Sequence, residues 1–180
     1  VRADLVSMII QNASDACGIG YLMTNVGPSF ESNGFSAVAR SCAVGNLSFA
    51  HELGHNEGAH HNPENAGSAA YPYAYGHYVN ASFRTVMAYV NQCPNGGSRV
   101  PYVSNPAISF NGSPTGIADQ RDNHRTINNT PLTVSQFREG LAATLTPTNT
   151  PTPTNTATAT ATNTPTNTAT ATNTPTNTAT

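Results

Sequence analysis

Apolar residues near the start of the chain predict the strands of a small sheet. The segment 3–10 contains an apolar run typical of a strand buried in a parallel sheet. Gly18–Met23 and Phe35–Arg40 are predicted as two further strands, because stretches of turn-forming residues separate the three segments. We therefore expect a small, mixed and twisted sheet.

The pattern then becomes helical. Asn46 or Ser48 is expected to cap a helix that runs through Leu53 and ends near Gly58, since glycine permits the left-handed conformation that closes many helices. A last helix is predicted at Thr133–Ala143. Two short apolar islands interrupt the Gly-, Pro- and Asn-rich chain between these helices: Val86–Val90 and Ala107–Phe110. The sequence therefore predicts an α/β (α+β) domain with a central helix, a loop-rich lower subdomain and a C-terminal helix.

Composition divides the 180 residues into two parts. All charged residues lie at or before Glu139, whereas every even position from 146 to 180 is Thr and the odd positions hold Pro, Asn or Ala. The recurring prolines and the lack of large apolar side chains favour an extended, solvated linker over a strand. We predict one domain at 1–145 and a disordered low-complexity linker at 146–180, and we expect a further module beyond the linker.

Charge and hydropathy argue against two classes of partner. The formal net charge is −2, and the seven basic residues are all Arg and are scattered, so no patch follows a phosphate backbone. The longest apolar run is far shorter than the roughly 20 residues of a membrane span. We therefore expect neither nucleic acid nor a membrane span.

One short segment carries the chemistry of a metal site. On a helix, His51 and His55 lie about 40° apart on one face and can hold one tetrahedral cation, with Glu52 beside them. A third ligand cannot reach back along a continuing helix, so the helix must stop. Gly58 permits the turn, and His61 falls where the returning chain completes the set.

Other candidate ligands fit this pattern less well. His60 could be the third ligand only if the pattern were shifted by one residue, and the spacing from Gly58 favours His61 instead. His77 and His124 have no metal-binding partner at a useful spacing. Glu57 and Glu64 come too early for an acidic ligand presented by a separate later helix, and we expect both to be solvated.

The pattern resembles the metzincin metallopeptidases, whose signature H-E-x-x-H-x-x-G-x-x-H is followed by a Met-turn. Thr85–Tyr89 is similar to that turn, with Met87 under the metal. Three more segments resemble the reprolysin-like bacterial peptidyl-Asp metallopeptidases: Ser41–Phe49, Tyr102–Pro106 and Asp122–Arg125. The resemblance covers roughly residues 3–140 and departs at Asn62, where Asp commonly follows the third histidine.

The resemblance implies a zinc metalloendopeptidase with a metzincin-like fold. We expect it to be secreted, since Thr-rich, Pro-punctuated segments are typical of stalks of exported proteins. The three histidines would hold one catalytic Zn²⁺, and Glu52 would act as general base for the water that attacks the peptide carbonyl. Tyr89 is a candidate to stabilise the oxyanion, with a simply packed ring as the alternative. Metzincins have a strand, a long helix and a second strand ahead of segment 3–10, so we expect the domain to be truncated at its N-terminus.

The resemblance also implies protein or peptide substrates and a preference for bonds next to Asp. Substrate would lie antiparallel to the sheet edge at Gly18–Met23 through main-chain hydrogen bonds. An acidic side chain needs a cation near its pocket. Arg99, which follows the Met-turn, is the candidate, and Arg84 and Arg125 are the alternatives.

The three cysteines are an odd number for disulfides. Cys17 with Cys42 is the preferred pair because both flank predicted neighbouring strands, although the pairing stays open. Cys93 is then left without a partner, and no cysteine is placed to replace a histidine on the metal.

Two other functions compete with the peptidase hypothesis. One is an inactive, zinc-stabilised binding domain, which would have no use for Glu52. The other makes the Thr- and Pro-rich tail the functional part, as a stalk or surface anchor with the domain as its cargo.

Overall fold

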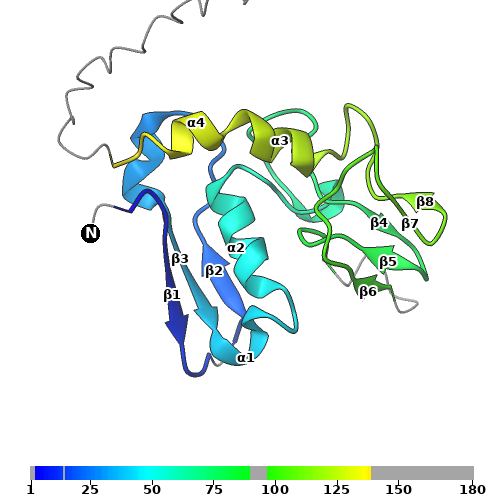
Figure 1. Ribbon diagram of the computed structural model, residues 1–180, viewed down its shortest axis with the longest axis horizontal. Coiled ribbons are helices and arrows are strands. Elements are labelled where there is room, and N and C mark those ends of the chain that lie inside the picture. The colour runs from blue at the N-terminus through cyan, green and yellow to red at the C-terminus, as the bar shows by residue number, and fades with distance from the viewer. Residues whose placement is uncertain (1–2, 14, 90–96, 139–180) are drawn as a thin grey trace, which may run out of the picture. The chain divides into compact units, whose positions relative to one another are not determined.

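The computed structural model of the protein describes residues 3–13, 15–89 and 97–138 (Figure 1). The predictions for Cys93, for the linker at 146–180 and for the end of the last helix lie outside the described residues. Within the described part of the chain, no helix is long and apolar enough to cross a membrane.

The first sheet has the strand order β1-β3-β2, with β1 at Val6–Ile10, β2 at Gly18–Gly20 and β3 at Phe35–Ala39. β1 is parallel to β3 and β2 is antiparallel to it, which confirms the predicted mixed sheet. β2 is shorter than predicted because the chain soon turns towards a helix: the Met23 amide donates to the oxygen of His55 at 3.0 Å. In the order β1-β3-β2, β2 forms one edge of the described sheet.

The central helix α2 spans Ser48–Asn56 and packs across β2 and β3 (Figure 1). It begins after Leu47, whose φ of 56° is left-handed, and no side chain caps it. The predicted capping by Asn46 or Ser48 is therefore wrong. Asn46 instead donates its side-chain amide to Cys17 Sγ at 3.3 Å.

A disulfide joins Cys17, one residue before β2, to Cys42 in the short helix α1 (Arg40–Ala43). This is the pairing that the sequence favours. The bridge spans a sequence separation of 25 residues, and closing a loop of that length stabilises a fold by about 3–4 kcal/mol through the unfolded chain. It also anchors the start of the edge strand.

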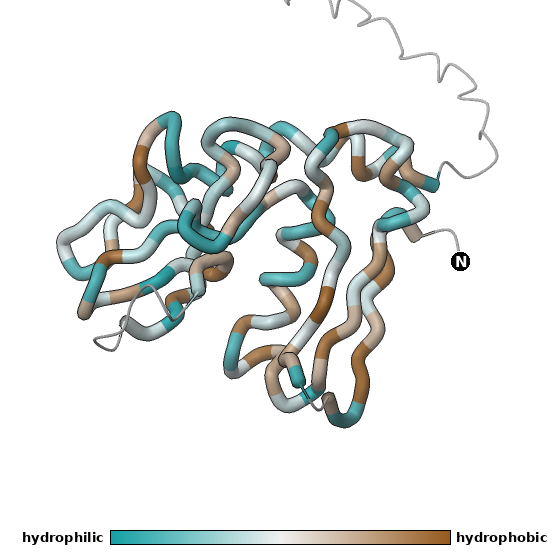
Figure 2. Tube along the Cα trace, turned by 180° about the vertical axis from the view of Figure 1, so that it is seen from behind, coloured by the Kyte–Doolittle hydropathy of each residue, from teal (hydrophilic) through white to brown (hydrophobic). Residues whose placement is uncertain are grey.

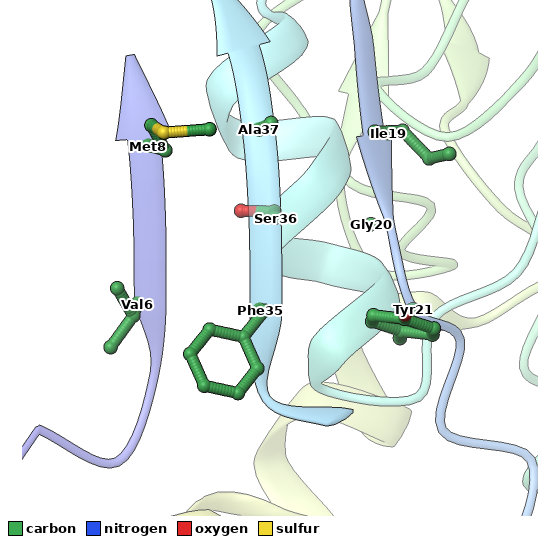
Figure 3. A pocket seen from close by; sticks show the side chains of 8 residues that line it. All are labelled: Val6, Met8, Ile19, Gly20, Tyr21, Phe35, Ser36 and Ala37. Carbon is green, nitrogen blue, oxygen red and sulfur yellow. The ribbon is translucent and has the colours of Figure 1, made fainter. Parts of the chain in front are cut away.

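The exposure of β1 differs from the prediction. Met8 and Ile9, which point to opposite faces of the sheet, are 60% and 50% exposed, because α2 packs on one face only, and there mainly across β2 and β3 rather than β1. The other face carries an open apolar hollow of about 510 Å³ (Figure 3), and hydrophobic segments recur along these strands (Figure 2). The opening strand is thus parallel as expected but not buried on both sides.

Two helices close the described chain where one was predicted. α3 spans Asn123–Asn129 and begins at Asp122, whose side chain accepts from the Arg125 amide at 3.0 Å. α4 spans Pro131–Val134, so the predicted helix at Thr133–Ala143 begins too late. The core at this end is a cluster of buried side chains: Met23, Phe30, Val134 and Phe137.

The predicted loop-rich lower part contains very short strands. Those of one sheet, in the order β4-β5-β6, are Tyr78–Val79, Phe83–Arg84 and Ser98–Arg99. β7 (Ser109–Phe110) pairs with β8 (Ser113–Pro114) across a turn. Strands of two residues leave no periodicity in a sequence, so they were not predicted.

Candidate metal centre

Two histidines of α2 share one face, and a glycine brings a third back to them. His51 and His55 are one helical turn apart and both are buried. α2 ends where Gly58 adopts a φ of +86°, which is strained for residues with a side chain. The predicted helix end is confirmed, and the turn delivers His61 to the other two rings.

The Nε2 atoms of the three histidines converge. His61 Nε2 lies 3.2 Å from His51 Nε2 and 3.0 Å from His55 Nε2, and the three ligand atoms all lie within 4.8 Å of one another. A tetrahedral ion with Zn–N distances of about 2.0–2.1 Å separates its ligand nitrogens by about 3.3 Å. The spacing therefore fits a tetrahedral ion with one position left for another ligand.

Backbone hydrogen bonds fix the tautomer of each ring. Each Nδ1 faces a carbonyl oxygen, which only accepts, so each Nδ1 carries the ring proton and each Nε2 presents a lone pair. The acceptors are Val86 for His51 (2.8 Å), Ala59 for His55 (2.9 Å) and Asn65 for His61 (3.3 Å). Three lone pairs cannot hydrogen-bond to one another, whereas one bound cation would accept all three at once.

Burial keeps the three imidazoles neutral. It is the main cause that lowers the pKa of His51 to about 3, with the nearby His55 adding to the shift. Burial likewise lowers the pKa of His55 and of His61 to about 4. Metal ions bind the neutral form of imidazole, so these rings are in the binding form near neutral pH.

His60 is not part of this cluster. Its Nδ1 accepts from the His61 amide at 2.8 Å, and its Nε2 lies 3.2 Å from the Gly67 amide nitrogen, so both ring nitrogens face the backbone. Within the described residues the potential metal-binding group contains neither His77 nor His124. The structure thus brings His61, and not its neighbour, to the helix ligands.

The side chain of Glu52 extends from α2 towards β2. It is 6% exposed, and burial raises its pKa to about 7 against the opposing charge of Arg99. A Cβ atom on Gly18 would lie only 2.7 Å from Glu52 Cγ, so the side chain runs directly against the backbone of the edge strand. A carboxyl group with a pKa near neutrality is suited to accept and return a proton.

Met87 is fully buried and packs against α2 at Gly54, which lies between the two helix ligands in the sequence. A Cβ atom on Gly54 would be 2.8 Å from Met87 Sδ, so a side chain at position 54 would collide with the sulfur. The preceding carbonyl, of Val86, accepts the hydrogen bond from His51. This segment therefore supports the helix and orients one ligand.

The ring of Tyr89 packs against the histidines. Its centroid lies 4.0 Å from that of His61 and 6.3 Å from that of His51. Burial raises the pKa of the Tyr89 hydroxyl, and the charge of Glu52 adds to the shift. The residue is still 38% exposed, so the ring is both packed on the ligands and open to solvent.

Arg99 lines a polar pocket of about 510 Å³ at the start of α2. Its Nη1 donates to the Asn46 oxygen at 2.8 Å, while its Nε is buried and has no hydrogen-bond partner in the described part of the chain. Burial lowers the pKa of Arg99, the charge of Arg84 lowers it further, and Glu52 opposes both. Among the described residues, Arg84 lines the same pocket and no acidic residue does. The pocket therefore favours an anion.

Arg125, the other alternative from the sequence, does not line this pocket. Its Nη1 lies 2.8 Å from Asp119 Oδ1, and its guanidinium group stacks over Tyr73 at 4.1 Å. Its charge is already neutralised at the surface.

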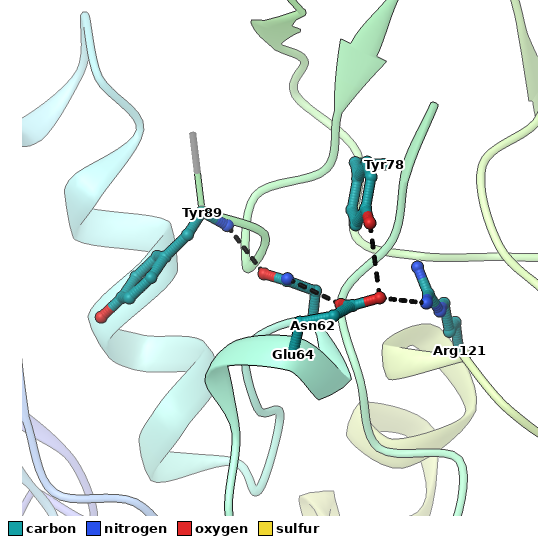
Figure 4. A network of polar contacts seen from close by, with 5 residues as sticks. All are labelled: Asn62, Glu64, Tyr78, Tyr89 and Arg121. Atoms are coloured by element: carbon teal, nitrogen blue, oxygen red, sulfur yellow. Dashed lines mark hydrogen bonds and ion pairs between the residues drawn. The ribbon is translucent and has the colours of Figure 1, made fainter. Parts of the chain in front are cut away.

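A polar network ties Asn62 to the chain that carries Tyr89 (Figure 4). Asn62 is fully buried: its Oδ1 accepts from the Tyr89 amide at 3.0 Å, and its Nδ2 donates to Glu64 Oε2 at 2.9 Å. Glu64 Oε1 accepts from Arg121 at 2.8 Å and from the Tyr78 hydroxyl at 3.3 Å, so Glu64 is not simply solvated as expected. The network needs a donor and an acceptor at position 62, which explains Asn in place of the usual Asp.

We expect Asn62→Asp to lower the melting temperature by about 3–10 °C, since an unsatisfied buried polar group costs about 1–3 kcal/mol. The change puts a second carboxylate where an N–H group now donates to Glu64 at 2.9 Å. Adding Glu64→Gln restores a donor and should recover most of the loss. Thermal melts at pH 7 measure both effects, and equal melting temperatures for the parent and the single variant would contradict this role of the network.

Sequence reasoning missed the glycines of β2 and the partners of Asn62. Gly18 and Gly20 alternate along a strand, a pattern that indicates close packing on one face. The network left no comparable signal, because Tyr78 and Arg121 lie far from position 62 in the sequence.

Comparisons with known proteins agree with this geometry. The family model described as "Metallo-peptidase family M12B Reprolysin-like" matches residues 1–121. A peptidyl-Asp metalloendopeptidase of Stenotrophomonas maltophilia (strain R551-3) is 45% identical over 142 residues, which cover 76% of this chain and 32% of that protein. One of Xanthomonas campestris pv. campestris is 43% identical over 136 residues, which cover 74% and 31%. The chain thus spans about a third of the length of these curated relatives.

A solved structure shares the fold at low sequence identity. A chain described under "Structure of a chaperone-substrate complex" has a TM-score of 0.56 and 20% identity, over 77% of this chain and 21% of that chain. That likeness concerns the fold alone. The family match covers more than half of the sequence and includes the three converging histidines. The chain belongs to the reprolysin-like metallopeptidases of family M12B.

Proposed function

We propose that the protein hydrolyses peptide bonds as a zinc metalloendopeptidase. The observation that carries this proposal is the convergence of three neutral imidazole nitrogens, with separations of 3.0 and 3.2 Å from His61 Nε2. His51, His55 and His61 would hold the ion, because their donor set and spacing fit tetrahedral zinc. Three imidazoles favour zinc over calcium or magnesium.

The residues around the zinc site would have different roles in the reaction. Zinc, when bound, supplies Lewis acidity to the attacking water and to the scissile carbonyl. Glu52 takes the proton of the attacking water and then delivers it to the leaving amine. Tyr89 donates a hydrogen bond to the oxyanion from its place over the ligand rings, and Met87 serves as the Met-turn that supports them.

Peptide substrate is proposed to lie antiparallel along β2 and the residues that follow, up to Met23. Among the described strands, β2 pairs only with β3, so it lies at an edge of the sheet. Edge strands offer main-chain groups to an extended peptide. Glu52 lies against the same strand, so a peptide bound there would run past the general base.

We further propose a preference for bonds next to Asp. The curated relatives bear the name peptidyl-Asp metalloendopeptidase, and the described lining of the pocket at Arg99 contains two arginines and no carboxylate. A guanidinium group is well suited to bind an acidic side chain. Arg99 is therefore the proposed specificity residue.

The disulfide between Cys17 and Cys42 supports a secreted protein, since such bonds persist in oxidising compartments. In the same proposal, the Thr- and Pro-rich segment at 146–180 is a linker to a further module. An inactive, zinc-stabilised binding domain is the competing function. Burial of Glu52 beside the ligands favours the peptidase, because a structural zinc site has no use for that carboxylate.

The test is digestion of an unstructured protein by the full chain, with cleavage sites mapped by mass spectrometry and metal content measured in parallel. We expect one zinc per chain, cuts next to Asp, and loss of cleavage on chelation with recovery on adding zinc. Zinc bound to a folded protein that cuts nothing would instead support the binding domain. Cleavage at sites unrelated to Asp would support the peptidase function and contradict the preference for Asp.

A further inference from the structure

The two glycines of β2 are not required by the backbone. Gly18 and Gly20 frame Ile19, which is 72% exposed, so the glycines share the face towards α2 and Ile19 takes the other. Among the described residues, the glycines with positive φ are Gly58 and Gly112. A glycine inside a strand weakens it, unless another part of the molecule must come close.

Glu52 is the part that comes close. A Cβ atom on Gly18 would lie 2.7 Å from both Cγ and Oε1 of Glu52, and 3.0 Å from its Cδ. A Cβ atom on Gly20 would lie 2.9 Å from the Glu52 backbone oxygen and 3.2 Å from Oε2. Real side chains do not show contacts below 3.0 Å, so the space beside both glycines is already filled by this one glutamate.

The helix and the strand cannot move apart to admit a side chain. One helical turn after Glu52, Asn56 Nδ2 donates to the backbone oxygens of Tyr21 at 2.8 Å and Phe35 at 3.2 Å. The Met23 amide is bonded to α2 as well. These bonds fix the distance between α2 and the edge strand.

We propose that Gly18 and Gly20 form a slot that positions the Glu52 carboxylate beside the histidine ligands. They are positioning residues, because they act only through Glu52. Glu52 follows the ligand His51 in α2, so the slot that holds its side chain also sets where the carboxylate lies relative to that ligand. The catalytic consequence rests on the proposed peptidase function, whereas the packing does not.

A double-mutant cycle in thermal stability tests the slot without any assay of activity. In the full chain, Gly18→Ala is expected to lower the melting temperature by about 5 °C or more, since its Cβ atom collides with the glutamate. In the Glu52→Ala background the collision is gone, and the same change should have no effect or raise the melting temperature. An equal decrease of the melting temperature in both backgrounds would show that Gly18 is needed for the strand itself and not for packing against Glu52. That result would overturn the slot.

Kinetics test the positioning role. Gly18→Ala should lower kcat by about 10- to 100-fold through a displaced carboxylate, with KM and zinc content unchanged. Gly67→Ala is the matched control, because a Cβ atom there meets nothing within 4 Å. Unchanged kcat in an active enzyme would overturn the positioning role. If the protein has no peptidase activity but still shows the coupling between positions 18 and 52 in its melting temperatures, the slot is supported and the proposed function is contradicted.

Discussion

Replacing Glu52 by Gln lowers kcat/KM for peptide cleavage by about 10³-fold, within the range of roughly 10²–10⁴ that proton transfer by a positioned side chain contributes. Gln has nearly the same shape, so it still fits between α2 and β2, but it cannot accept a proton. The histidine rings are untouched, so one zinc per chain should remain. Steady-state kinetics on a peptide, with metal analysis of the same sample, measures both quantities.

Glu57→Gln is the matched control for this experiment. Glu57 directly follows α2, and burial raises its pKa too, so the same chemical change is made in a partly buried setting. It is not among the metal-binding residues, and its activity should equal that of the parent. Full activity of Glu52→Gln would require another base. Loss of zinc together with activity would point instead to damage of the ligand geometry.

The metal ligands could be predicted from the sequence because their geometry is local. His51 and His55 need only the period of one helix, and His61 needs only a turn that Gly58 permits. The groups that orient the rings could not be predicted. The acceptor for His51 is a backbone oxygen, of Val86, and any residue type at that position would supply it.

The same division holds for the fold. The three strands of the first sheet follow from their apolar runs and the turns between them. The start of α2 does not, because Leu47 in a left-handed conformation replaces the side-chain cap that Asn46 and Ser48 suggested. α3 had a usable signal in Asp122, which caps it, although the Asn-rich surroundings hid the helix.

The exposure of Met8 shows a second limit of pattern reasoning. An apolar run indicates that a strand has apolar neighbours on both faces, and it says nothing of which segment provides them. Here α2 covers one face, and the hollow beside Val6, Ile19 and Phe35 stays open (Figure 3). The strand could be predicted from its own residues. Its burial could not, because burial depends on segments that lie far away in the sequence.

Replacing Arg99 by Gln removes most of the preference for Asp. A charge-assisted hydrogen bond contributes about 1.5–3 kcal/mol, so kcat/KM for an Asp peptide should fall by about 10- to 150-fold. The matching Asn peptide should be affected little, because it never formed the ion pair. The ratio of the two values, measured with each enzyme, is the result to compare, since it does not change with the amount of active protein.

The ratio also separates Arg99 from its neighbours. Arg125→Gln should leave the ratio unchanged, because that guanidinium is paired with Asp119 at 2.8 Å. Arg84→Gln should lower the preference less, since Arg84 lines the pocket beside Arg99, whose buried Nε has no partner among the residues that the structure describes. A preference for Asp that survives Arg99→Gln and disappears with Arg84→Gln would assign specificity to Arg84. Survival in both variants would mean that the acidic side chain binds elsewhere, because within the described lining of this pocket no other cation remains to hold it.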